Sequence, residues 1–219
     1  MPLFACQGFA GTTTKALAKA AAVSEALLYK HFPSKKALYQ AILKCGPETT
    51  DRAFRRLQNM TPSTETLVYF AHLAVWRLLG DKDSVAGARM QDMQRFVMNS
   101  LMGDGEFTRL HFAQIAANPG HLFEACFKKA QEAGDIVTGV SARNAFWFMH
   151  HLATTFGNMH LPKEPVVKYA GKQESLIREA VTFILRGFGM KESVIQAKYD
   201  PKALMRSVRA DDAAAAKAA

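Results

Sequence analysis

The chain has 219 residues, of which 49% are hydrophobic, enough for the core of one compact unit or of a small domain and a larger one. Its formal net charge is +9, and residues 1–46 hold six lysines against one glutamate, so more than half of this excess lies near the N-terminus. This charge indicates a polyanionic partner, or the solvated lysines of a high-pI protein. The absence of about eighteen consecutive apolar residues excludes a membrane-spanning helix.

The cysteines and the start of the chain indicate a cytoplasmic protein. Cys6, Cys45 and Cys126 are odd in number and form no CxxC pair, which favours reduced thiols over disulfides or a structural zinc site. The first residues lack the basic start and the apolar stretch of a signal peptide. We therefore expect a cytoplasmic protein with no membrane partner.

Residues 8–38 contain two short amphipathic helices separated by a tight turn. Thr12 and Thr13 can cap the first helix, and Ser24 can cap the second. Between them, residues 20–23 form a turn of small residues. Two short helices joined in this way are a helix-turn-helix, whose second helix is free to enter a DNA major groove.

These residues resemble the DNA-binding domain of the TetR family of bacterial transcriptional repressors. The matching positions are Gly8-Phe9, Thr12, Leu17-Ala18, 20–24, Leu28-Tyr29, His31-Phe32 and Ser34-Lys35. The resemblance implies a homodimeric repressor that binds a palindromic operator and is released by a small-molecule effector.

The sequence departs from the family pattern at the turn, in the second helix and at the N-terminus. Ala22 stands where the family usually has glycine, so we expect a strained backbone angle there. Ala26 and Leu27 replace a glycine and a small hydroxyl residue, which makes the recognition surface more apolar. Residues 3–5 resemble the end of the family's first helix, and we expect that helix to be truncated.

After residue 34 the apolar residues recur almost everywhere at helical spacing, which predicts an all-α fold. Ser34 caps a helix that ends at Gly46-Pro47, and a polar segment around Arg52 precedes a further helix start at 61–63. Further helices are predicted over 86–101, 105–117, 119–133, 142–159 and 174–188.

The sequence predicts three parts. Residues 1–46 form the helix-turn-helix DNA-binding domain, and residues 47–200 form a helical effector-binding and dimerisation domain. Residues 201–219 form a C-terminal tail, either a further helix or a frayed low-complexity segment.

The predicted DNA contacts lie on and around the two short helices. Thr12, Thr13 and Lys35 lie at helix N-termini, where phosphates bind. The resemblance implies that Tyr29 and His31 also contact the backbone. The residues at the positions that read base edges are Ser24, Glu25, Ala26 and Lys30.

The last two strongly apolar helices are the predicted dimer interface, since the resemblance implies a four-helix bundle between two subunits. A two-fold dimer also explains how short recognition helices read two half-sites. The alternative is that these faces build the core of one subunit. The candidate residues are Trp147, Phe148, His151, Phe156, Ile177, Val181, Ile184 and Phe188.

The middle helices are rich in methionine and aromatic residues, and the resemblance implies that they enclose an apolar effector site. The candidate lining residues are Trp76, Met90, Met93, Phe96, Phe112, Phe123 and Phe127. Simple core packing is the alternative for each of them. Possible polar anchors are Arg89, Gln114, Asn118 and His121.

The histidines and the motifs of known enzymes give no sign of a metal, a cofactor or catalysis. His150 and His151 are adjacent, so their side chains diverge by about 100° on a helix and do not readily share an ion. The sequence contains no GxSxG, P-loop or GxGxxG motif. We expect a dimeric, ligand-responsive repressor that is not an enzyme. The alternative is an all-α small-molecule-binding or scaffold protein whose DNA-reading head does not function.

Overall fold

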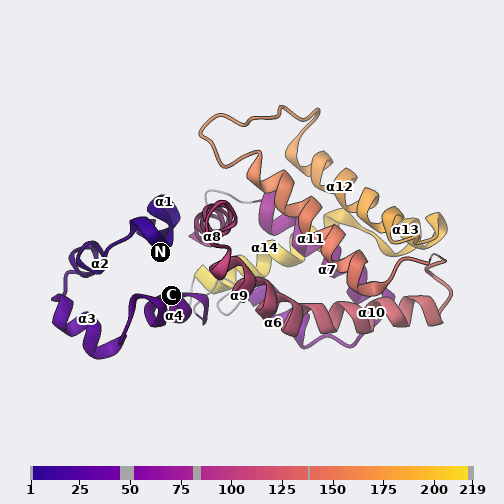
Figure 1. Ribbon diagram of the computed structural model, residues 1–219. Helices are drawn as coiled ribbons and strands as arrows, with labels where there is room; N and C mark the ends of the chain where they lie inside the picture. The colour runs from indigo at the N-terminus through magenta and orange to yellow at the C-terminus, as the bar shows by residue number, and fades with distance from the viewer. Residues whose placement is uncertain (1, 45–51, 81–84, 138, 217–219) are drawn as a thin grey trace.

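The computed structural model describes residues 2–44, 52–80, 85–137 and 139–216, and these residues are helical almost throughout (Figure 1). An isolated β-bridge between Ile136 and Met190 is the exception to helical pairing in this part of the chain. The all-α prediction is confirmed. The helices are α1 (Pro2–Gly11), α2 (Thr14–Ala20), α3 (Glu25–His31), α4 (Lys35–Lys44), α6 (Arg52–Gln58), α7 (Thr64–Leu79), α8 (Val85–Met102), α9 (Glu106–Ile115), α10 (His121–Glu132), α11 (Ala142–Asn158), α12 (Gln173–Gly187), α13 (Glu192–Lys198) and α14 (Pro201–Ala216).

Helices α1 to α4 form a reading head (residues 2–44) that lies to one side of a helical body formed by α6 to α14 (Figure 1). Helix α8 lies where the two parts meet, with α1 packed against it. In the body, α7 is central and contacts α10, α11 and α12. None of the described helices combines the length and the apolar character needed to cross a bilayer.

Hydroxyl side chains cap five of these helices at their N-termini. Each of five cap residues accepts a hydrogen bond from the backbone N–H three positions later, which satisfies one of the unpaired donors of a helix N-terminus. These caps are Thr13, Ser24, Ser34, Ser63 and Ser141, with distances of 3.0 to 3.3 Å. The short helices of the head therefore begin at the residues that sequence reasoning selects.

Several elements differ from the prediction. The polar segment around Arg52 is helix α6, because Ala53 and Leu57 lie four residues apart and are both buried. Helix α13 was not predicted. The expected break at Pro119 is a π-helical turn, 116–120, that joins α9 to α10 without an interruption.

The C-terminal segment is helical and packs on the body. Helix α14 contacts α6 and α7, and its Val208 is fully buried. Arg56 of α6 donates to Ser207 and pairs with Asp211 of α14. We therefore assign residues 201–216 to the body in place of a separate tail.

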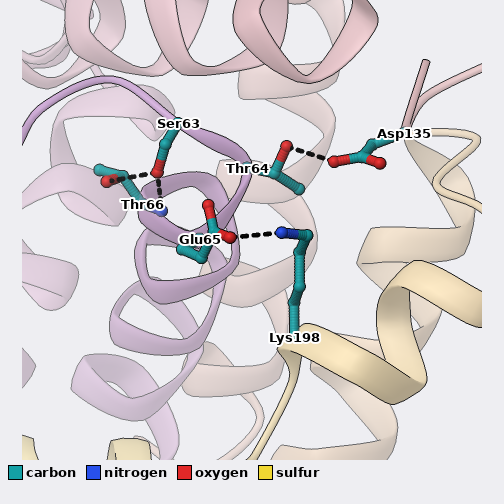
Figure 2. A network of polar contacts seen from close by, with 6 residues as sticks. All are labelled: Ser63, Thr64, Glu65, Thr66, Asp135 and Lys198. Atoms are coloured by element: carbon teal, nitrogen blue, oxygen red, sulfur yellow. Dashed lines mark hydrogen bonds and ion pairs between the residues drawn. The ribbon is translucent and has the colours of Figure 1, made fainter. Parts of the chain in front are cut away.

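A polar network fixes the N-terminus of α7 to two distant segments (Figure 2). The Thr64 hydroxyl donates to Asp135 over 2.7 Å, and Lys198 of α13 forms an ion pair with Glu65. Ser63 caps α7 beside them. The turn after α10 and helix α13 are thereby tied to the central helix.

The two interactions of this network differ in burial, so we expect different stability losses when they are removed. Thr64 is 5% exposed, and Asp135→Ala leaves its hydroxyl without its acceptor, which costs about 1–3 kcal/mol. Lys198→Ala removes a solvent-exposed pair and costs less than about 1 kcal/mol. Urea unfolding measures both. Equal losses in the two variants would contradict this assignment.

Candidate DNA interface, ligand cavity and subunit interface

Helices α2 and α3 are joined by a turn whose backbone is strained where the sequence predicts it. Ala22 has a φ of 54°, the left-handed region that glycine adopts without cost. The turn is held by Val23 N–H, which donates to Ala18 C=O over 3.0 Å. Leu28 is the one buried residue of α3, and the other residues of this helix are exposed.

The outer face of α3 carries the predicted base-reading and backbone-contacting residues, and all of them are exposed: Ser24, Glu25, Ala26, Tyr29, Lys30 and His31. Two of them are tied to α2 through a residue that sequence reasoning missed. The Thr14 hydroxyl donates to Glu25 Oε1 over 2.8 Å, and the Tyr29 hydroxyl donates to Thr14 Oγ1 over 3.3 Å. The orientation of α3 on α2 is therefore fixed by polar contacts at the surface that would meet DNA.

Two predicted phosphate contacts point into the head. Thr12 is fully buried, and its hydroxyl donates to Gly8 C=O over 2.7 Å. Lys35 Nζ donates to Phe9 C=O over 2.6 Å and to Thr12 C=O over 3.0 Å, and it lies 4.3 Å from the centre of the Phe9 ring. Both side chains satisfy carbonyls at the end of α1. Of the three residues predicted at helix N-termini, Thr13 alone keeps an exposed position.

Because Lys30 is exposed and Lys35 is bonded inside the head, we expect their substitutions to affect DNA binding differently. Lys30→Ala removes an exposed charge beside the recognition surface and should make the slope of log affinity against log salt shallower by about one unit. Lys35→Ala should leave that slope unchanged and lower the stability of the head, because it leaves two carbonyls unpaired. Fluorescence anisotropy between about 50 and 200 mM salt measures the slopes. A shallower slope for Lys35→Ala would restore it as a phosphate contact.

A cavity of about 110 Å³ lies in the body between α7, α8, α9 and α11. Three of the predicted residues, Met90, Met93 and Phe112, line it. The other four do not line the cavity, because their rings pack between other segments. Trp76 faces Arg209 and Phe96 packs on Tyr39. Phe123 and Phe127 both pack on Phe188.

The polar residues of the cavity are ones that sequence reasoning missed: Arg77, Gln94, His111, His150 and Thr154. Gln114, Asn118 and His121 do not line it, and the side chain of Arg89 lies outside the described residues. Polar residues recur along amphipathic helices, so the sequence does not tell which of them face a cavity.

The two histidines of the cavity are neutral at pH 7. Burial lowers the pKa of His111 to about 4. Burial, together with the neighbouring His151 and His111, lowers the pKa of His150 to about 3. In the described part of the chain, no three His, Cys, Asp or Glu side chains are grouped as a metal site requires.

Helices α11 and α12 carry two exposed phenylalanines. Phe148 on α11 is 64% exposed and Phe183 on α12 is 68% exposed, and His151 is exposed beside them in the sequence of α11. Trp147 and Phe156 are half-buried, against Phe112 and Tyr169 respectively. Large apolar side chains left in solvent are typical of an interaction surface.

Four of the predicted interface residues lie in the core of one subunit, which is the alternative to a dimer interface that the sequence left open. Ile177, Val181, Ile184 and Phe188 are each at most 3% exposed, because this face of α12 packs on α7 and Phe188, the residue after α12, packs on Phe127 of α10. The exposed face of α12 lies one residue away and includes Phe183, which the sequence analysis overlooked. In the sequence, Phe183 could have been found as an aromatic residue among the charged positions of an amphipathic helix.

Comparison with known proteins agrees with this architecture. The family described as bacterial regulatory proteins, tetR family, matches residues 1–42. The chain is 28% identical over 103 residues to the nucleoid occlusion factor SlmA of Marinomonas sp. (strain MWYL1), covering 47% of this chain and 49% of that protein. It is 36% identical over 66 residues to SlmA of Actinobacillus pleuropneumoniae serotype 5b (strain L20), covering 29% and 33%. The chain thus spans about half the length of the first relative and a third of the second.

Solved structures show the same fold over most of the chain. A putative transcriptional regulator, SCO4942 from Streptomyces coelicolor, superposes with a TM-score of 0.55 at 19% identity, over 86% of this chain and 93% of its own. The TetR family transcriptional regulator PfmR from Thermus thermophilus does so with a TM-score of 0.53 at 20% identity, over 84% and 93%. The family is one of regulators and not of enzymes. Residues 1–42 therefore carry the DNA-binding domain of the TetR family of bacterial regulatory proteins, on a helical body that shares the fold of solved transcriptional regulators.

Proposed function

We propose that this chain acts in the cytoplasm as a homodimeric repressor that binds a palindromic operator in double-stranded DNA and is released by a small-molecule effector. The observation that carries this proposal is the exposed outer face of α3, held on α2 by Thr14 and capped by Ser24. A short helix whose polar face is free and whose position is fixed is what major-groove reading requires.

The charge of the reading head supports binding to a polyanion. Residues 1–46 carry a net excess of five positive charges, and no arginine occurs before Arg52. Ser24, Glu25, Ala26 and Lys30 are the candidate base-reading residues, and a glutamate can accept from cytosine while a lysine can donate to guanine. With so few base-reading groups, the affinity should be largely electrostatic and strongly dependent on salt.

The exposed aromatic residues of α11 and α12 support the dimer. Burying Phe148 and Phe183 against their copies in a second subunit removes two large apolar side chains from water on each subunit. A two-fold pair would place two α3 helices on half-sites about 34–36 Å apart or a multiple of that spacing.

The junction between head and body supports communication between ligand and DNA. Met93 and Val97 of α8 line the cavity and also belong to an aromatic cluster formed by Phe4, Tyr39, Phe96 and Phe107. Tyr39 comes from α4, which follows the recognition helix in the chain. An occupied cavity that shifts α8 would therefore shift α4, and a coupling of about 1–3 kcal/mol is typical of such switches.

Fluorescence anisotropy with the DNA that flanks the chain's own gene tests the DNA-binding part. We expect sequence-dependent binding of one dimer per site, with scrambled DNA of equal length as the control. Weak binding that is equal for both sequences would favour the alternative, a small-molecule-binding or scaffold protein whose head does not read DNA.

A further inference from the structure

A residue that lines the cavity carries a buried amide nitrogen without a hydrogen-bond partner. Gln94 of α8 is 5% exposed, and its Nε2 finds no acceptor among the described residues. A buried donor that is left unpaired destabilises the fold, so such groups are rare in the absence of a role. A molecule that entered the cavity with an acceptor would remove this penalty.

A residue of a second helix leaves the space that this amide occupies. Gly157 of α11 faces it without a side chain, and a Cβ at position 157 would lie 2.1 Å from Gln94 Nε2 and 3.3 Å from Leu78 Cβ. Any other residue at position 157 would therefore displace the amide. The glycine and the glutamine fit each other across the interface of α8 and α11.

A second unpaired polar atom lines the same cavity. Nδ1 of His150 is buried without a partner, and its ring packs edge-on against Phe112 and Trp147 at centroid distances of 5.3 and 5.6 Å. A neutral imidazole nitrogen makes one hydrogen bond, as donor or as acceptor according to the tautomer. The charged Arg77 at the cavity wall has an interaction of its own, and no carboxylate lines the cavity within the described part of the chain.

The remaining wall is apolar and the space is small. Met90, Phe112, Met149 and Ala153 are among the apolar residues of this wall, which is suited to a ring. An engineered cavity of about 150 Å³ in another protein holds benzene. The 110 Å³ available here is of that order and suits a single ring.

We infer that this cavity binds a neutral single-ring molecule bearing one hydroxyl group, with the hydroxyl directed at Gln94 and His150. A hydroxyl oxygen accepts from the amide and also donates, so it satisfies an imidazole nitrogen in either tautomer. A carboxylate would have to give up its hydration to enter this largely apolar space. The inference rests on the proposed ligand-responsive function, for which this molecule would be the effector.

Calorimetry on the full chain without DNA tests the ligand class with three probes of similar size: phenol, toluene and benzoate. Phenol should bind about tenfold more tightly than toluene, as expected for one added hydrogen bond, and more tightly than benzoate. Toluene binding as tightly as phenol, or benzoate binding most tightly, would overturn the inference.

Two variants test the role of the amide. Gln94→Leu should lower the phenol affinity to that of toluene and raise the melting temperature of the unliganded chain, because it removes an unpaired polar group. Gly157→Ala should also lower the phenol affinity, since it displaces the amide. Gln131→Leu, at an exposed position on α10, is the control and should change neither value. Unchanged phenol affinity in Gln94→Leu, or a lower melting temperature, would assign Gln94 to the fold alone.

The same probes distinguish this inference from the regulatory proposal. If phenol binds as expected but leaves the operator affinity unchanged, the proposed release of DNA by a ligand is contradicted, and the inferred binding site is retained. Operator binding by a chain that takes none of the three probes would contradict the site and leave DNA recognition in place.

Discussion

Phe183→Asp should convert the dimer to a monomer and abolish tight operator binding. Phe183 is 68% exposed in one subunit, so a charge there is tolerated by the monomer. In the dimer two such charges would be buried without partners, which should weaken association by at least about 3 kcal/mol, more than a hundredfold. Sedimentation equilibrium measures the association, and anisotropy measures the loss of operator affinity.

Two controls make this result specific. Val137→Asp places a charge at a comparably exposed apolar residue, 65% exposed, outside α11 and α12, and should leave the dimer intact. Ile184→Asp should lower the melting temperature of the subunit itself, because Ile184 is 3% exposed within it. If the Phe183→Asp variant remained a dimer, the interface would lie on another surface.

Tyr39→Ala should uncouple the head from the body. The Tyr39 ring is 4% exposed and lies 4.7 to 5.1 Å, between centroids, from the rings of Phe4, Phe9, Phe96 and Phe107. Removing an aromatic ring from such a site costs about 3–5 kcal/mol through lost burial and the cavity left behind. Hydrogen exchange should show α1 and α4 opening while α7 and α12 stay protected.

Tyr39→Phe keeps the ring and is the matched control, so its ligand response should resemble that of the unmodified chain. Tyr39→Leu is a milder truncation that should retain DNA binding and respond less to a ligand. A full ligand response in Tyr39→Leu would show that coupling does not pass through the aromatic cluster.

The starts of the helices could be predicted from the sequence because capping is local. Thr13, Ser24 and Ser34 each bond a backbone N–H three residues away, and no distant part of the chain is involved. The strain at Ala22 is likewise a property of one residue and its turn. Local chemistry also placed Lys30 on an exposed face.

The roles of individual side chains depended on contacts between distant segments. Lys35 fits the pattern of a phosphate contact, but in the fold it meets the carbonyls of Phe9 and Thr12, 26 and 23 residues earlier. Helical periodicity identifies Ile184 as apolar and does not say which apolar face meets the subunit's own core. That was decided when α12 packed on α7, which buried Ile184 and left Phe183 in solvent.

The sequence by itself determined the all-α fold, the helix-turn-helix and the charge of the head, since these depend on periodicity, caps and composition along the chain. The tertiary structure decided which aromatic residues surround a cavity, that Gln94 and His150 both line it, and which phenylalanines remain for a partner. The physical reason is that burial is a property of packed helices: a side chain's neighbours come from elements far away in sequence, and no local pattern records them.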